Sequence, residues 1–238
     1  MPYTHIIFVG HHQEKLLESI RALHRYPAQK IILVVGESVT SGEDKARRIA
    51  KAISNELKPI WDVVEERVDK KNVLNATNQL LDLILQEKQA GSDVLVNASG
   101  SLRTFAIAAY VVCCCTRSPM ITSIPRYDEL DNEVGIEEII ELPLIPINFP
   151  TEEQKKILQG ITIKATSFKN LIRRLDSAGA QDQSVFQKER SRISHHLSNM
   201  EEMMLIKKQK KGKEVQISLT FLGQIMTKII TIDDNHTS

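Results

Sequence analysis

Short apolar runs alternate with amphipathic stretches along the first 142 residues. The first run, residues 4–9, ends at Gly10, and leucine and isoleucine then recur every three or four positions over residues 13–23. Three more pairs follow, with apolar runs at residues 31–35, 61–68 and 94–96 and helical patterns at residues 43–57, 73–89 and 104–115. This alternation predicts strands separated by helices.

Two further apolar runs, residues 120–124 and 136–142, supply a fifth and a sixth strand. The last run alternates apolar with acidic residues, as an edge strand does. Val- and Ile-rich strands joined by helices indicate a mostly parallel sheet with helices on both faces and right-handed crossovers. We therefore predict an α/β domain over residues 1–142, with a Rossmann-like, mostly parallel six-stranded sheet.

Ligands of such sheets bind beyond the carboxyl ends of the strands. The segment 97–103, after the fourth strand, is small and hydroxylated and leads into a helix N-terminus, where free N–H groups favour an anion. Arg103 adds a cation, so we expect a phosphate-bearing ligand, although a simple turn and helix cap would explain residues 99–101 equally well. The candidate ligand-binding residues are Gly10, His11, Ser38, Asn97, Ser99, Gly100, Ser101 and Arg103.

Several familiar chemistries lack their motifs in this sequence. One glycine follows the first strand where the dinucleotide fingerprint needs three, and neither a GxxxxGK[ST] loop nor a GxSxG elbow is present. The adjacent cysteines 113–115 have no zinc spacing and read as packing residues, and His11 and His12 lack a third metal ligand. We therefore predict no metal site, no cofactor and no identifiable catalytic residue.

The N-terminal residues do not form a signal peptide, and no window approaches the roughly 18 apolar residues of a membrane span. We expect a cytoplasmic protein that does not enter the membrane.

The second part of the chain follows a different pattern. Prolines 143, 146 and 150 predict a linker over residues 143–150, because proline interrupts both helices and interior strands. Helical patterns follow at residues 151–158, 168–175 and 184–203, and two short strands at residues 205–208 and 214–219 flank a basic tip that contains a glycine. A last helix begins at Thr220, and this order predicts a winged helix-turn-helix domain over residues 151–238.

The charge is divided unevenly between the two parts. Residues 1–150 carry 16 basic and 20 acidic side chains, whereas residues 151–238 carry 15 and 10. Between Lys155 and Lys213 there are 14 basic and 5 acidic residues, which suggests a polyanionic partner, although a solvated basic face would explain the charge alone equally well.

Together with the winged-helix pattern, this charge predicts binding to double-stranded DNA. Arg190, Arg192 and His195 are the candidates for base edges, and the lysines of the wing are candidates for phosphates or the minor groove. The expected DNA-binding residues are Lys188, Arg190, Arg192, His195, His196, Lys208, Lys210, Lys211 and Lys213.

Two segments resemble known families. Residues 194–223 are similar to the winged helix of the MarR and ArsR type, with Leu219-Thr220-Phe221-Leu222-Gly223 matching its Leu-Thr-x-x-Gly, although residues 176–189 exceed the usual short turn. The segment Asn97-Ala98-Ser99-Gly100-Ser101-Leu102-Arg103 resembles the Asn-x-Thr/Ser-Gly-Gly-Thr-Lys motif of CARF (CRISPR-associated Rossmann fold) domains, with Ser101 and Leu102 as departures. The order of the domains resembles the archaeal CARF-type transcriptional regulators of CRISPR loci.

The resemblance implies a homodimer that binds a cyclic oligoadenylate, with cyclic tetra-adenylate as the expected effector, across the two-fold axis of its sensing domains. It carries Gly10, Ser99, Gly100, Ser101 and Arg103 into the ligand site. It also implies regulation of CRISPR-Cas genes through paired winged helices. Two alternatives stay open: a ring nuclease that cleaves the cyclic nucleotide, and a winged-helix sensor of another small anionic ligand.

Overall fold

The computed structural model describes residues 2–38, 40–100, 103–161, 166–175, 183–212 and 214–236. The chain divides into two compact units, Met1–Pro146 and Ile147–Ser238. The division falls within the proline-rich segment 143–150, and each unit is described by itself.

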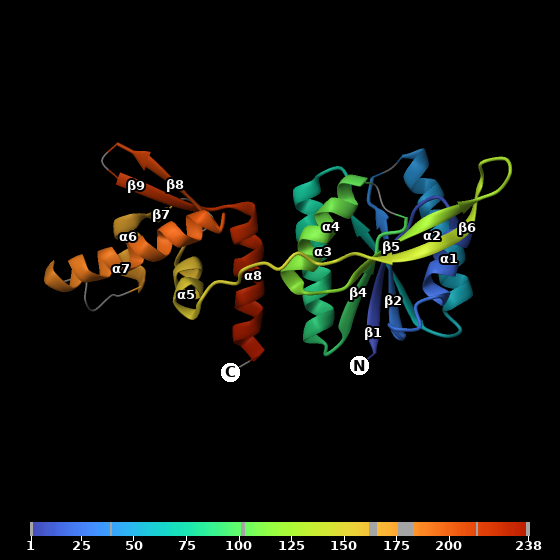
Figure 1. Ribbon diagram of the computed structural model, residues 1–238, viewed down its shortest axis with the longest axis horizontal. Coiled ribbons are helices and arrows are strands. Elements are labelled where there is room, and N and C mark those ends of the chain that lie inside the picture. Colours follow the sequence, from blue (N-terminus) through green and yellow to red (C-terminus); the bar gives the residue numbers. More distant parts are fainter. Residues whose placement is uncertain are drawn as a thin grey trace. The chain divides into compact units, whose positions relative to one another are not determined.

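The first unit contains a six-stranded sheet (Figure 1). Its elements are β1 (Tyr3–Phe8), α1 (Gln13–Arg21), β2 (Ala28–Gly36), α2 (Ser41–Leu57), β3 (Asp62–Val68), α3 (Val73–Gln89), β4 (Asp93–Asn97), α4 (Arg103–Thr116), β5 (Met120–Tyr127) and β6 (Glu133–Glu141). The strand order is β3-β2-β1-β4-β5-β6, in which β1 to β5 are parallel and β6 runs antiparallel at the edge. This is the Rossmann order, and the predicted mostly parallel six-stranded α/β sheet is confirmed.

Helices cover both faces of this sheet because successive side chains of a strand point to opposite faces. Ile7 and Leu33 belong to a core cluster with Leu16 of α1 and Ile53 of α2. On the opposite face the ring of Phe8 lies 4.4 Å from that of Phe105 in α4. Burying each such side chain contributes roughly 1.5–3 kcal/mol, so both helical layers help to fix the sheet.

The hairpin of β5 and β6 is longer than the sequence suggested. The prediction ended the fifth strand at Ile124, but β5 continues to Tyr127 and β6 begins at Glu133. The pairing shifts register between Ile124 and Pro125, so the strand accommodates the proline at an irregular position.

The second unit combines helices with a small antiparallel sheet. Its elements are α5 (Glu152–Gly160), β7 (Thr166–Ser167), α6 (Phe168–Leu175), α7 (Gln183–Glu202), β8 (Ile206–Lys211), β9 (Glu214–Leu219) and α8 (Phe221–His236). The strand order is β7-β9-β8. The sequence analysis missed β7, because two residues are too few for a periodic pattern.

Local signals explain where these elements begin. Thr151 accepts a hydrogen bond from the backbone N–H of Gln154, whose side chain caps Thr151 in return, so α5 starts with a capping box. At Gly223 a Cβ atom would lie 1.9 Å from the carbonyl oxygen of Leu205. The glycine of the Leu-Thr-x-x-Gly segment is therefore required by the close packing of α8 against the segment that enters β8.

The buried histidine of β1 makes the stability of the first unit depend on pH. His5 is 1% exposed, its Nε2 lies 2.8 Å from the carbonyl oxygen of Tyr26, and burial lowers its pKa from the usual value. Below about pH 6.5 the unfolded chain binds a proton that the folded chain resists, so the free energy of unfolding falls as the pH falls.

We expect His5 to lower the free energy of unfolding by at most about 1.4 kcal/mol for each pH unit below about pH 6.5. Urea unfolding at pH 7.5 and 5.5, followed by the fluorescence of Trp61, the single tryptophan of the chain, measures it. His5→Gln should show a smaller loss between the two pH values than the wild type, with the exposed His24→Gln as the matched control. Equal losses in His5→Gln and wild type would contradict the assignment.

Candidate functional site

A pocket of about 230 Å³ opens at the carboxyl ends of β1 and β4, where the strand order reverses direction. Parallel α/β sheets bind their ligands at this position. The lining residues are Val9, Gly10, His11, His12, Lys15, Glu43, Ala46, Lys70, Ser99 and Gly100.

Two glycines let the loops after β1 and β4 touch. A Cβ atom on Gly10 would lie 2.6 Å from the carbonyl oxygen of Gly100, and one on Gly100 would lie 2.2 Å from the carbonyl oxygen of Phe8. Real side chains do not approach backbone atoms this closely, so both positions require glycine. The floor of the pocket is therefore formed by two backbone segments in direct contact.

The loop after β4 is shaped by a fully buried amide. The Nδ2 of Asn97 donates to Ser19 Oγ at 2.9 Å, and its Oδ1 accepts a hydrogen bond from the N–H of Ser99 at 3.0 Å. Asn97 thus holds the loop from beneath. Ser99, 8% exposed, lines the pocket, and its Oγ has no hydrogen-bond partner among the described residues. An unpaired buried hydroxyl costs roughly 1–3 kcal/mol, which a ligand atom would recover.

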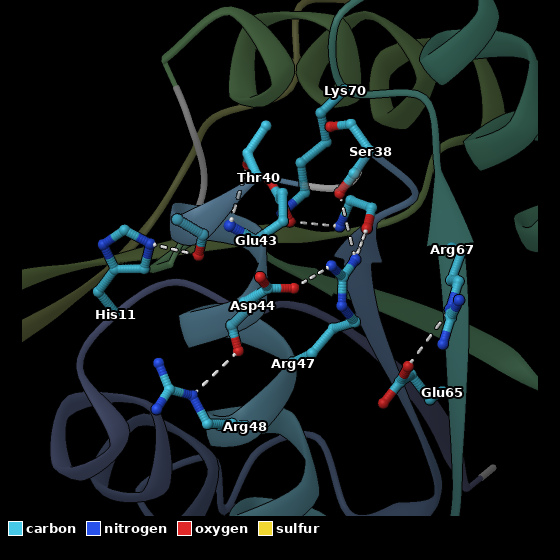
Figure 2. A network of polar contacts seen from close by, with 12 residues as sticks. His11, Ser38, Thr40, Glu43, Asp44, Arg47, Arg48, Glu65, Arg67 and Lys70 are labelled. Carbon is cyan, nitrogen blue, oxygen red and sulfur yellow. Dashed lines mark hydrogen bonds and ion pairs between the residues drawn. The ribbon is translucent and has the colours of Figure 1, made fainter.

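A network at the start of α2 forms one wall of the pocket (Figure 2). The carboxylate of Glu43 accepts a hydrogen bond from the N–H of Gly36 at 2.7 Å and lies 3.5 Å from Lys70 Nζ. Arg47 donates to the carbonyl oxygens of Gly36 and Ser38 at 2.9 and 3.3 Å. Burial lowers the pKa of Lys70, and the nearby Glu43 opposes this shift.

Lys70 was missed by the sequence analysis. It follows β3, and the predicted pocket took residues only from the ends of the first, second and fourth strands. The same rule of strand ends, applied to the third strand, would have found it.

A second ion pair lies at the mouth of the pocket. Lys15 Nζ is 2.9 Å from Glu133 Oε2, and His12 Nδ1 is 3.7 Å from the same oxygen. The other histidine of the pocket, His11, has its Nε2 3.0 Å from the carbonyl oxygen of Gly42. Each lysine of the pocket is therefore paired with a carboxylate.

The structure brings only part of the predicted ligand set together. Gly10, His11, Ser99 and Gly100 line the pocket. Ser38 and Asn97 are not among the lining residues. The carbonyl oxygen of Ser38 accepts a hydrogen bond from Arg47, and Asn97 lies beneath the loop, where it donates to Ser19. Arg103 is exposed at the first residue of α4 and is likewise outside the lining, and Ser101 lies outside the described residues.

Several of the predicted DNA-binding side chains of the second unit are exposed. On α7 these are Lys188, Arg190 and His195, whereas His196 is half-buried with its ring 6.0 Å from that of His195. On β8, Lys210 and Lys211 are exposed. Lys213 lies outside the described residues.

Arg192 and Lys208, whose side chains are 41% and 27% exposed, form ion pairs within the second unit. Arg192 pairs with Glu189 at 2.7 Å and with Glu153 of α5, and these two carboxylates raise its pKa. Lys208 Nζ lies 2.8 Å from Glu201. Arg192 therefore ties α7 to α5, and Lys208 ties β8 to α7, so either side chain would have to leave a carboxylate before it reached DNA.

The cysteines and the possible metal ligands are two further kinds of chemistry-bearing group among the described residues. All three cysteines are buried in α4, and burial raises the pKa of the Cys113 thiol and raises that of Cys115 to about 12. The described residues contain no group of three or more His, Cys, Asp or Glu side chains that could hold a metal ion. Among the same residues, the helices are too short or too polar to span a lipid bilayer.

The strand order and the pocket define the first unit as a Rossmann-like α/β domain. A model of the family described as "HFX_2341_N:-like, N-terminal" matches residues 3–127, which is more than half of the chain. The chain belongs to this family.

A protein of Archaeoglobus fulgidus described as an uncharacterized protein is 22% identical over 224 residues, which cover 93% of this chain and 95% of that protein. Among solved structures, Can2 from Sulfobacillus thermosulfidooxidans in complex with cyclic tetra-adenylate aligns with a TM-score of 0.40 and 15% identity, over 96% of this chain and 64% of that one.

Protein VC1899 from Vibrio cholerae aligns with a TM-score of 0.45 and 13% identity, over 96% of this chain and 65% of that one. Csm6 from Enterococcus italicus, bound to cyclic hexa-2′-fluoro-hexa-dAMP, aligns with a TM-score of 0.41 and 8% identity, over 86% and 57%. The chain thus spans less than two thirds of the length of each of these three proteins.

The contact between the two loops can be tested by adding one methyl group. Gly100→Ala places a Cβ atom against the carbonyl oxygen of Phe8, and we expect the free energy of unfolding of the first unit to fall by about 1–3 kcal/mol. Urea unfolding followed by Trp61 fluorescence measures the change.

Gly42→Ala is the matched control, because its Cβ would meet only the ring of His11 at an ordinary 3.7 Å and alanine favours the helix. We expect that variant to be as stable as the wild type or more so. A Gly100→Ala protein of wild-type stability would show that the two loops do not approach as described.

Proposed function

We propose that this protein is a ligand-responsive DNA-binding regulator. The first unit binds a cyclic oligoadenylate, with cyclic tetra-adenylate as the first candidate, and the second unit is a winged helix-turn-helix that binds double-stranded DNA. Regulation of CRISPR-Cas genes follows from the resemblance to CARF-type regulators.

The single observation that carries the ligand proposal is the buried, unpartnered Ser99 hydroxyl on the floor of the pocket. Ser99 lies in the segment that resembles the CARF motif. Beside it, Gly10 and Gly100 carry no side chain, so their backbone lines the pocket. α4 begins three residues after Gly100, so its N-terminal N–H groups favour an anion near this loop. Ser101 and Arg103 remain part of the proposed ligand site.

The size of the pocket supports a homodimer. Typical small-molecule sites measure roughly 300–1,000 Å³, so a pocket of about 230 Å³ holds only part of a ring of four nucleotides. The rest of the ring would need a second pocket, and a two-fold symmetric pair of chains supplies one.

An apolar groove beside the pocket is the proposed dimer surface. Its volume is about 500 Å³, and its lining residues are Ala98, Ala106, Ile107, Tyr110, Met120, Thr122, Leu142 and Pro143. Ile107 of α4 is 66% exposed there. Because Ala98 directly precedes Ser99, a second copy seated in this groove would bring its own ligand loop close to the first.

We expect Ile107→Asp to shift the full-length chain from dimer to monomer, since it places a charge in the apolar contact. Light scattering at several concentrations measures the molar mass, and Ile60→Asp, an exposed isoleucine outside the groove, is the control. A dimer that survives Ile107→Asp would place the interface elsewhere.

For DNA binding, α7 is the proposed recognition helix and the β8–β9 hairpin is the proposed wing. Lys188, Arg190 and His195 are available on the helix, and Lys210 and Lys211 on the wing, with Lys213 also assigned to the wing tip. Arg192 and Lys208 support the helix and the wing through their ion pairs rather than through contacts with DNA.

We expect the double variant Lys210→Ala, Lys211→Ala to weaken binding to all DNA sequences alike. The negative slope of log K against log salt concentration should become shallower by about 2, because two phosphate contacts are lost. Arg190→Ala should reduce discrimination between sequences by about 1–3 kcal/mol instead. Fluorescence anisotropy with duplex DNA measures both.

The pair Lys51→Ala, Lys58→Ala removes two exposed lysines from the first unit and is the matched control. If the wing variant and this control give the same salt slope as the wild type, the hairpin does not contact DNA.

Cleavage of the ligand is the second candidate function, and His11 is the observation that favours it. In the neutral tautomer whose Nε2–H donates to the Gly42 carbonyl, Nδ1 is left as a proton acceptor at the pocket. Linear products after incubation with labelled cyclic tetra-adenylate would identify a ring nuclease, whereas intact ligand supports a sensor.

A further inference from the structure

The two carboxylates that neutralise the pocket lysines differ in how firmly they are held. Glu43 pairs with Lys70 and also accepts a hydrogen bond from the Gly36 N–H, so it is part of the wall. Glu133 lies 2.9 Å from Lys15, yet its buried Oε2 accepts no well-aligned hydrogen bond from the described residues. Glu133 is therefore the carboxylate that can leave.

The Lys15–Glu133 pair is sheltered from solvent. The side chain of Lys15 is 12% exposed and that of Glu133 is 19% exposed, so the pair is less screened than an ordinary surface ion pair. An anionic ligand that reaches Lys15 competes with this carboxylate, because two anions beside one sheltered ammonium group repel each other with little screening.

Glu133 is the first residue of β6, which is the last strand of the first unit in the sequence. The strand ends at Glu141, five residues before the first unit ends at Pro146. β6 pairs with β5 alone, and that pairing is irregular at two points, so an edge strand of this kind can shift without disrupting a second neighbour.

A second contact with α1 anchors β6 further along. Glu18 accepts hydrogen bonds from the N–H of Ile136 at 2.8 Å and from Arg126 at 3.1 Å. Release of Glu133 would thus loosen the start of β6 while its middle stays attached to α1.

We propose that Glu133 occupies the anion position at Lys15 in the ligand-free protein and that an anionic ligand displaces it. The carboxylate competes with the ligand, and its displacement passes the state of the pocket to β6. This proposal rests on the proposed binding of an anionic ligand in the first unit.

The test compares Glu133→Gln with the wild-type full-length chain. We measure binding of cyclic tetra-adenylate and of inorganic pyrophosphate by isothermal titration calorimetry at low salt. Because glutamine cannot compete as an anion, Glu133→Gln should bind both probes about tenfold more tightly. Glu129→Gln, which removes an exposed carboxylate of the same hairpin, should match the wild type.

A double-mutant cycle with Lys15→Gln separates competition from general electrostatics. In the Lys15→Gln background, Glu133→Gln should no longer increase the affinity for the probes, because the ammonium group for which the carboxylate and the ligand compete is absent. Amide hydrogen exchange provides the second readout: residues 133–135 should exchange faster when either probe binds to the wild type, whereas the Ile136 amide, held by Glu18, should not change.

The outcomes test two hypotheses separately: that Glu133 competes with an anionic ligand, and that this ligand is cyclic tetra-adenylate. Tighter binding of pyrophosphate with no binding of cyclic tetra-adenylate would uphold the role of Glu133 and reject the proposed effector. Glu133→Gln that binds the probes no better than the wild type would overturn the proposal, as would a wild type that binds neither probe. A gain that persists in the Lys15→Gln background would also overturn it.

Discussion

The contact between the backbones that follow β1 and β4 is the constraint on which the first unit depends. Gly100 lies so close to the end of β1 that no side chain fits at either Gly10 or Gly100. This approach forms the floor of the pocket at the point where the strand order reverses, and it orients the loop that carries Ser99. The buried Asn97 amide then fixes the shape of that loop.

The positive charges of the two pocket lysines are neutralised by two carboxylates. Lys70 faces Glu43 and Lys15 faces Glu133, so an incoming anion meets cations that already have partners. Under the competition proposed for Glu133, an anion would enter by exchange with that carboxylate, and this exchange would couple occupancy of the pocket to β6. Glu43, which also accepts the Gly36 N–H, is fixed at the start of α2, whereas Glu133 lies at the start of the edge strand β6.

Some basic residues of the second unit form ion pairs that join its elements, and others are exposed. Arg192 joins α7 to α5, and Lys208 joins β8 to α7, through carboxylates of the same unit. Lys210, Lys211 and Arg190 remain exposed around this frame. Ion pairs therefore hold the helix and the hairpin together, and the exposed cations lie on the elements that these pairs fix.

The sequence by itself determined the helices, the longer strands and the edge of the sheet where the pocket lies, because hydrophobic period is a local property and alternating strands and helices favour parallel strands; the two-residue β7 and the full length of β5 lay outside it. The helix Val73–Gln89, for example, has the bounds that its pattern predicted. Only the tertiary structure decided the partners of the charged residues. Lys15 and Glu133, or Glu153 and Arg192, lie far apart in the chain, and no local pattern records which lysine or arginine will meet which carboxylate once the elements pack.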